Sequence, residues 1–136
     1  MAPELSLSRT PVGEWIVNTR TSGDARLPMP GGDVGPFGNA VDPDLGLSPL
    51  FNSLPVLRHN LHKGGSVGEL VMVWISVPDL GIHPSLQRYT HLEQLTDGAR
   101  VRFEAVAQDG EDFVADIVFD RDGLVADYPG IAHRIP

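Results

Sequence analysis

Three carboxylates have the residue types and the expected spacing to do chemistry together: Glu104, Asp116 and Asp127. They fall in three consecutive segments that are typical of strands, and the hairpin registers that keep apolar partners together place all three on one sheet face. Neighbouring carboxyl groups can act as an acid/base pair or bind a hard cation through oxygen. The interpretation we favour is a solvated outer face on which Arg102 screens the row.

The turn after the first of these strands decides which residues face each other. A two-residue turn at Asp109-Gly110 would set the apolar face of one strand against the polar face of the next. A loop one residue longer, at 109–111, keeps apolar residues together and predicts Phe103 opposite Ile117. The same register predicts Glu104 directly opposite Asp116, an arrangement that needs a compensating positive charge or a raised pKa.

Histidines supply one further catalytic candidate. His91 follows Arg88 and Tyr89 and would be available for proton transfer if this segment faces a cavity. His59 and His62 have the three-residue spacing of some metal-binding pairs, but no third ligand lies near them in the sequence. We therefore predict no metal site and no cofactor.

The composition excludes several classes of protein. The 136 residues contain no Cys, so disulfides, thiolate metal sites and cysteine nucleophiles are absent. Eighteen acidic residues against ten basic ones give a net charge of −8, which repels phosphate, so nucleic acid is not an expected partner. No stretch approaches the ~18 apolar residues of a membrane span, and we expect a cytoplasmic protein. No nucleophile elbow, phosphate loop or dinucleotide fingerprint occurs.

Strands are the elements that must position these side chains. Apolar residue types and a period of two indicate strands at 12–18, 67–77, 100–107, 113–119 and 124–128. The 67–77 segment is apolar on both faces, which predicts the central strand. Residues 87–92 are expected to form one more strand or a single helical turn. Because no segment has the pattern of a long, capped amphipathic helix, the predicted fold class is all-β.

One domain covering residues 1–136 is the expected organisation, because the length fits a single core. Residues 1–11 are expected to form an N-terminal tail. The segment 27–38 holds three Pro and four Gly in twelve residues, which predicts irregular backbone in the form of a long loop or lid. Phe37 within it has the apolar character needed to dock on a core.

Four pieces of the sequence follow a recognisable order. Residues 41–58 contain an aspartate, a Ser-Pro step, the run Asn52-Ser-Leu-Pro and an arginine. Residues 74–80 contain Val77-Pro78, 87–92 carry Gln-Arg-Tyr, and 122–131 carry Asp-Tyr-Pro-Gly. From about Trp15 to Arg134 these pieces resemble the bacterial family of putative glycolipid-binding proteins.

The resemblance implies a curved antiparallel sheet that forms a spiral roll, a half-barrel or a small barrel, similar to bacterial lipoprotein carriers. Members usually have additional strands before the segment that resembles the one at Trp15, whereas only Met1–Pro11 precede it here. The chain is therefore expected to correspond to the C-terminal two-thirds of the family domain. An exposed sheet edge would follow, and a homodimer is one way to cover it.

Binding of a hydrophobic or amphipathic, glycolipid-like small molecule on the concave sheet face is the leading functional expectation. Polar anchors for its head group would be Asn52, Arg58 and Arg88. The apolar lining would be Met72, Trp74, Tyr89 and Phe103, which are ordinary core residues if that face is filled.

The alternative is a cavity enzyme of the cyclase or isomerase type, which folds a flexible apolar substrate such as a polyketide with acid/base help. Its candidate residues are Glu104, Asp116, Asp127 and His91. The family resemblance transfers no catalytic residue.

Overall fold

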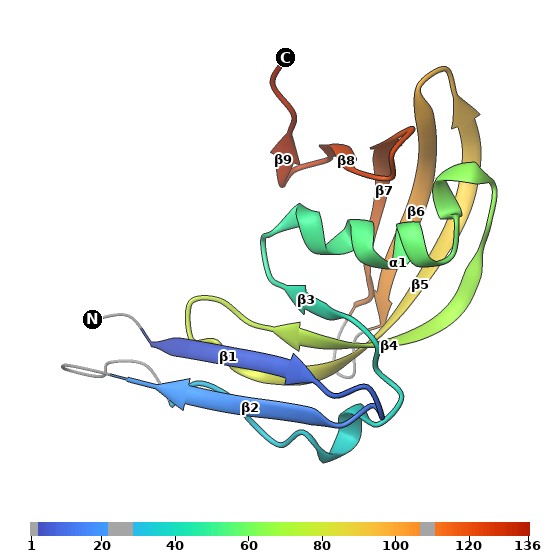
Figure 1. Cartoon of the computed structure of the whole chain (residues 1–136). Coiled ribbons are helices and arrows are strands. Elements are labelled where there is room, and N and C mark those ends of the chain that lie inside the picture. Colours follow the sequence, from blue (N-terminus) through green and yellow to red (C-terminus); the bar gives the residue numbers. More distant parts are fainter. Residues whose placement is uncertain (1–2, 22–28, 107–110) are drawn as a thin grey trace. The chain divides into compact units, whose positions relative to one another are not determined.

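A computed structural model describes residues 3–21, 29–106 and 111–136 (Figure 1). Strands dominate and helices are short, so the predicted all-β class is confirmed. There is a two-stranded sheet, β1-β2, and a seven-stranded sheet in the order β3-β4-β5-β6-β7-β8-β9. The chain divides into two compact units, of which unit 1 is Met1–Gly46 with Val71–Pro84 and unit 2 is Leu47–Leu70 with Ser85–Pro136. The single domain stays a prediction.

Unit 1 combines a β-ribbon with the first strands of the larger sheet. Its elements are β1 (Glu4–Arg9), β2 (Trp15–Arg20), the 3-10 turn η1 (Gly35–Phe37), β3 (Pro43–Leu45) and the second half of β4 (Val67–Ile75). Strand β3 pairs in parallel with β4, an exception to the antiparallel sheet that was expected. The core of this unit is formed by Phe37, Ala40, Val73, Ile75 and Ile82, with alternate residues of β1 and β2 packed against it.

The N-terminal segment is more ordered than a tail. Strand β1 forms within residues 1–11 because Leu5 and Leu7 lie on one face of the ribbon and pack on the core of unit 1. In the Pro/Gly-rich segment, residues 27–28 lie outside the described part of the chain. From residue 29 onward the segment is folded into unit 1, since Phe37 is fully buried and Gly31 forms a bridge with Gly81.

Unit 2 packs a helical segment on one face of the sheet. Its elements are η2 (Pro49–Asn52), α1 (Ser53–Arg58), η3 (Leu61–Lys63), most of β5 (Ile82–Leu95), β6 (Gly98–Val106), β7 (Phe113–Asp120), β8 (Val125–Tyr128) and β9 (Ala132–His133). The pairs from β5–β6 to β8–β9 are antiparallel, and β6 and β7 bend around the helical turns (Figure 1). Val56 and Leu61 pack into a core with Tyr89, Phe103 and Phe119.

The helix α1 differs from the prediction. Ser48-Pro49 and the run Asn52-Ser-Leu-Pro have the residue types of turns and so predict a corner ahead of a strand at Val56, but Val56 lies inside α1 with its side chain fully buried. Ser-Pro steps also open helices, because proline lacks the N–H that the first helical turn leaves unpaired. The chain therefore makes helical turns, and these fill the sheet face of unit 2 that was expected to hold a ligand.

The register between β6 and β7 is two residues away from the predicted one. Arg102 faces Asp116 and Phe103 faces Ala115, whereas the prediction set Glu104 opposite Asp116. A shift of two residues leaves every side chain on its predicted face, so the apolar face was correct while the partners were wrong. The observed register places opposite charges together and avoids opposed carboxylates.

Two further strand predictions need correction or completion. The 67–77 segment is not central, since β4 is second in the larger sheet and β6 lies in the middle. Residues 87–92, where a strand or a helical turn was left open, lie inside the 14-residue strand β5. Two of the three residues of the predicted turn at 109–111, residues 109 and 110, lie outside the described part of the chain.

Candidate functional site

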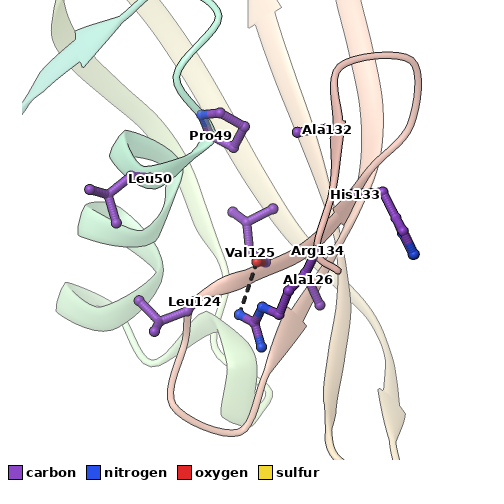
Figure 2. Close-up of a pocket in the computed structure, with 8 residues that line it drawn as sticks. All are labelled: Pro49, Leu50, Leu124, Val125, Ala126, Ala132, His133 and Arg134. Carbon is purple, nitrogen blue, oxygen red and sulfur yellow. Dashed lines mark hydrogen bonds between the residues drawn. The ribbon is translucent and has the colours of Figure 1, made fainter. Parts of the chain in front are cut away.

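A pocket of about 310 Å³ lies in unit 2 between η2 and the C-terminal strands (Figure 2). It is lined by Pro49, Leu50, Leu124, Val125, Ala126, Ala132, His133 and Arg134. Most of these side chains are apolar. The polar ones, His133 and Arg134, are neighbours in the sequence. Its volume is at the low end of the roughly 300–1,000 Å³ of small-molecule pockets, so the pocket suits one narrow apolar group with a polar end.

Apolar side chains at this pocket remain in contact with solvent. Leu50 at the start of η2 is 63% exposed, and Leu124 just before β8 is 41% exposed. Single exposed leucines are common on protein surfaces, but two that line the same concave pocket offer apolar area to a ligand. Pro49 opens η2 and so starts the wall that faces the C-terminal strands.

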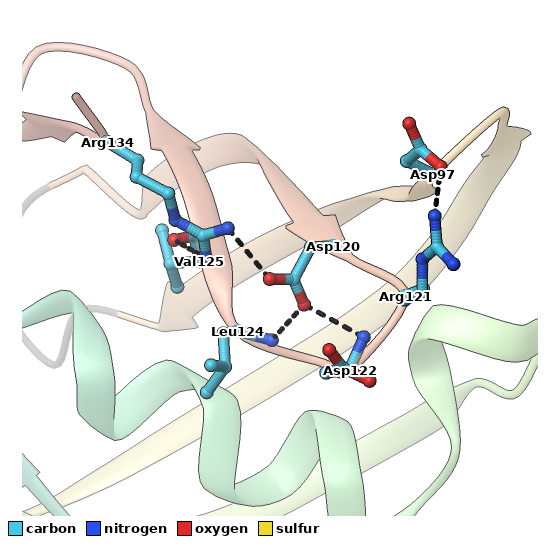
Figure 3. A network of polar contacts seen from close by, with 7 residues as sticks. All are labelled: Asp97, Asp120, Arg121, Asp122, Leu124, Val125 and Arg134. Atoms are coloured by element: carbon cyan, nitrogen blue, oxygen red, sulfur yellow. Dashed lines mark hydrogen bonds and ion pairs between the residues drawn. The ribbon is translucent and has the colours of Figure 1, made fainter. Parts of the chain in front are cut away.

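Arg134 is fixed at the pocket by a polar network (Figure 3). Its Nη1 donates to Asp120 Oδ2 at 2.8 Å and its Nη2 donates to the carbonyl oxygen of Val125 at 3.0 Å. Asp120 Oδ1 in turn accepts from the backbone N–H groups of Asp122 at 2.9 Å and Leu124 at 3.0 Å. These contacts therefore hold the guanidinium in one orientation.

The network also sets the ionisation of Asp120. Partial burial, the largest influence, raises its pKa, but the N–H of Leu124, the Arg134 side chain and the N–H of Asp122 together bring the pKa below its ordinary value. Asp120 is thus a carboxylate at neutral pH and holds the arginine charge. Arg121 and Asp97 form a neighbouring pair at 2.7 Å that is largely exposed and acts as a solvated surface contact.

The predicted row of carboxylates does lie on one sheet face, opposite the core of unit 2. Each has its own partner: Arg88 lies 3.4 Å from Glu104, Arg102 lies 2.8 Å from Asp116, and His133 lies 3.2 Å from Asp127. The hydrogen bond from Arg102 lowers the pKa of Asp116, although partial burial opposes it. Each carboxylate of this face therefore has a partner of its own, whereas the interpretation we favoured had Arg102 screen the whole row.

A stability measurement at low pH checks these ion pairs. The pKa values of Asp116 and Asp120 are lowered in the folded state, so their stabilisation is present above the ordinary pKa of about 3.9 and is lost as the pH falls through the lowered values. We expect the free energy of unfolding in urea to fall below about pH 4. Asp120→Asn should make this fall shallower, and an unchanged slope would contradict the assignment.

His91 anchors the helical segment to the sheet. Its Nδ1 lies 2.8 Å from the carbonyl oxygen of Leu61, and since a carbonyl only accepts, Nδ1 carries the proton and donates. Gln94 donates to the carbonyl oxygen of His62 at 3.3 Å in the same region. Both contacts tie η3 to β5, and neither residue lines the pocket.

Several predicted ligand-binding residues lie in the core of unit 2. Asn52 Nδ2 donates to the hydroxyl of Tyr89 at 3.0 Å, and that hydroxyl lies 3.3 Å from Gln87 Oε1 and donates to it. All three side chains are buried. The ring of Phe103 lies 5.1 Å from the ring of Tyr89, between centroids. Asn52, Tyr89 and Phe103 are thus placed as packing residues around a buried polar chain.

The other four predicted ligand-binding residues are distributed over both units. In unit 2, Arg58 is exposed at the end of α1, and Arg88 donates to the carbonyl oxygen of Gly68 at 3.1 Å besides pairing with a carboxylate. In unit 1, Met72 is buried and Trp74 is 38% exposed. The pocket in unit 2 is lined by none of the seven predicted residues.

The residues that the structure describes are 3–21, 29–106 and 111–136. In these ranges no group of three or more His, Asp or Glu side chains is placed to hold a metal ion. Within the same ranges there is no helix whose length and apolar character would let it cross a membrane.

A comparison with known families gives the relationship of this chain. The family described as "Putative glycolipid-binding" matches residues 1–134. The chain belongs to this family. The match begins at residue 1, so the expectation that only the C-terminal two-thirds of the glycolipid-binding family domain is present is wrong in that detail.

A solved structure supports the fold of this family member. The crystal structure of a DUF1089 family protein from Pseudomonas aeruginosa, at 1.80 Å resolution, aligns with a TM-score of 0.67 and 25% sequence identity over 96% of this chain. The chain spans 61% of the length of that protein. Among curated proteins no match is found.

Sequence reasoning reached the family but missed the pocket. The Asp-Tyr-Pro-Gly segment was recognised as a family motif, yet the residues on either side of it, Leu124–Ala126 and Ala132–Arg134, supply most of the pocket. The η2 wall could not be inferred, since it comes from a distant part of the sequence.

Proposed function

We propose that this protein binds an amphipathic small molecule of the glycolipid type, with the apolar part in the pocket between η2 and β8–β9 and the polar end beside Arg134. The observation that carries the proposal is an apolar pocket with an oriented guanidinium at its lining. Membership of the putative glycolipid-binding family supports the class of ligand. Burial of apolar ligand surface contributes about 0.8 kcal/mol for each methylene.

The ligand position in this proposal differs from the one the sequence indicated. The sheet face beneath Tyr89 and Phe103 is occupied in unit 2 by Val56 and Leu61. At about 310 Å³, the pocket accepts one chain end and leaves the head group outside. Arg134 uses two of its N–H groups on Asp120 and Val125, and its planar fork remains suited to hydroxyl or anionic oxygens of a head group.

The cyclase or isomerase alternative has less support. Its candidate side chains, Glu104, Asp116, Asp127 and His91, form ion pairs or anchor η3. None of the four lines the pocket. An acid or base must reach the reacting atoms within hydrogen-bond distance, and the pocket does not bring these groups to a ligand.

Calorimetry with alkyl β-glucosides tests the proposal. The alkyl chains have six, eight and ten carbons, and each concentration is kept below that at which micelles form. We expect the Kd to fall by about fourfold for each methylene that enters the pocket, and then to level off once the pocket is full. A Kd that is independent of chain length, or no binding at all, would contradict apolar burial as the source of affinity.

A pair of matched variants locates the binding. Leu124→Asp places a charge in the pocket and should weaken octyl β-glucoside binding by about tenfold or more. Leu92→Asp is the control, because Leu92 has a similar exposed fraction, 39% against 41%, and does not line the pocket. An equal loss in both variants would argue against this site.

A further inference from the structure

An exposed tryptophan beside a polar cluster lies in unit 1, and the pocket of unit 2 does not use it. Trp74 at the end of β4 keeps 38% of its surface exposed, and its ring lies 5.4 Å from the ring of His83, tilted by 39°. An indole that stays in contact with solvent next to polar groups offers an apolar face and hydrogen-bonding partners to the same ligand.

Three polar side chains interact beside Trp74. Ser76 Oγ lies 3.3 Å from the carbonyl oxygen of Gly81 and 3.5 Å from His83 Nε2, so its one proton can be donated either to this carbonyl or to Asp79. A hydrogen bond from Ser76 lowers the pKa of Asp79, and the N–H groups of Asp79 and Gly81 and the nearby His83 act in the same direction against desolvation. Asp79 is therefore a carboxylate at neutral pH, held next to a hydroxyl and an imidazole.

Gly81 leaves room for these groups to converge. A Cβ added at residue 81 would lie 2.9 Å from Asp79 Oδ2, 3.0 Å from His83 Nε2 and 3.1 Å from Ser76 Oγ. Polar atoms of three side chains thus meet on the side of Gly81 that lacks a side chain. The three are ends of side chains that can move, so an alanine at residue 81 would push the cluster apart without forcing the backbone.

We propose that Trp74, Ser76, Asp79 and His83 bind the ring of a saccharide. The C–H face of a pyranose is apolar and packs on an indole, while its hydroxyl groups both donate and accept. The carboxylate only accepts, the serine hydroxyl donates and accepts, and the imidazole donates, so the set matches hydroxyl groups. An ammonium ligand would only donate and would leave the donors of this cluster without acceptors.

The geometry does not favour a hydrolase. In a Ser-His-Asp triad the imidazole lies between the hydroxyl and the carboxylate. Here Ser76 contacts both of the other groups directly. All residues of this proposed site belong to unit 1 and none lines the pocket, so the inference stands independently of the amphiphile proposal.

The indole N–H signals in ¹H–¹⁵N correlation spectra test this site, because the chain has two tryptophans. Trp15 is the internal reference, since its Nε1 donates to the carbonyl oxygen of Ala40 at 3.2 Å. With the methyl glycosides of glucose, galactose and mannose at up to about 50 mM, enough to detect a millimolar Kd, the Trp74 signal should shift and the Trp15 signal should stay. Trp74→Phe assigns the two signals.

Variants separate this site from the pocket. Asp79→Asn and Gly81→Ala should weaken saccharide binding by about tenfold, because each disturbs hydrogen bonds to a charged group. Leu124→Asp, the pocket variant, should leave the Trp74 shift unchanged. The proposal would be overturned if none of the three glycosides shifts the Trp74 signal, or if Asp79→Asn keeps full affinity. It would also be overturned if only tetramethylammonium, a cation without hydroxyl groups, shifts the signal. These outcomes do not depend on the result with alkyl glucosides.

Discussion

Replacing Gly98 with alanine is expected to lower the free energy of unfolding by about 3 kcal/mol or more. Gly98 opens β6 with φ at +156°, where side chains are strained. An added Cβ would overlap the carbonyl oxygen of Phe119 and lie 2.8 Å from the Cα of Asp120. These are backbone atoms of the paired strand, so they cannot move without breaking the start of the β6–β7 ladder.

Urea unfolding of Gly98→Ala measures this effect, with Gly68→Ala as the matched control. Gly68 lies in β4, and an added Cβ there meets no atom within 4 Å. The control should change the free energy of unfolding by less than about 0.5 kcal/mol. Since Asp120 anchors Arg134, the residual folded Gly98→Ala protein should also bind octyl glucoside more weakly. Similar stabilities for both variants would show that the β6–β7 ladder tolerates displacement.

Tyr89→Phe is expected to destabilise unit 2 by about 1–3 kcal/mol while leaving the affinity for octyl glucoside unchanged. The hydroxyl accepts from Asn52 and donates to Gln87 in a buried environment, so its removal leaves polar groups without this partner. Tyr89, Asn52 and Gln87 all lie outside the lining of the pocket. Unfolding in urea and calorimetry on the same preparation check the two halves of the prediction.

The double variant Asn52→Leu with Tyr89→Phe supplies the control. Replacing both partners of a buried hydrogen bond with apolar groups removes the unpaired donor that a single replacement creates. The double variant should therefore be less destabilised than the sum of the single variants. If Tyr89→Phe keeps full stability but loses ligand affinity, the original interpretation of Tyr89 as a ligand-binding residue would be correct instead.

Local patterns account for what the sequence could predict of the fold. The apolar face formed by Val101, Phe103 and Ala105 follows from a period of two, and this period is visible in a single strand. The register is a property of two strands, and the period is the same after a shift of two residues. The opposite charges of Arg102 and Asp116 were the available clue. Helix α1, with six residues, is too short to show a helical period.

The candidate site was harder to predict because core residues and ligand anchors use the same residue types. Asn52 and Tyr89 have the aromatic and amide groups of a binding site, but their hydrogen bonds are to each other. The pocket joins η2 to strands near the C-terminus, and no sequence pattern reports such a contact. For Trp74 the sequence identified a candidate ligand-binding residue, while Asp79 and His83 beside it were not singled out.

The hydrogen-bonded chain from Asn52 through Tyr89 to Gln87 has a consequence for the precision of unit 2. A helix held only by apolar contacts could shift along a sheet at little cost in free energy, because one apolar contact replaces another. Here, any such sliding would strand a buried donor, so the helical turns have one docking position. Val56 and Leu61 thereby keep the same partners against β5 and β6, and unit 2 has one core packing rather than several.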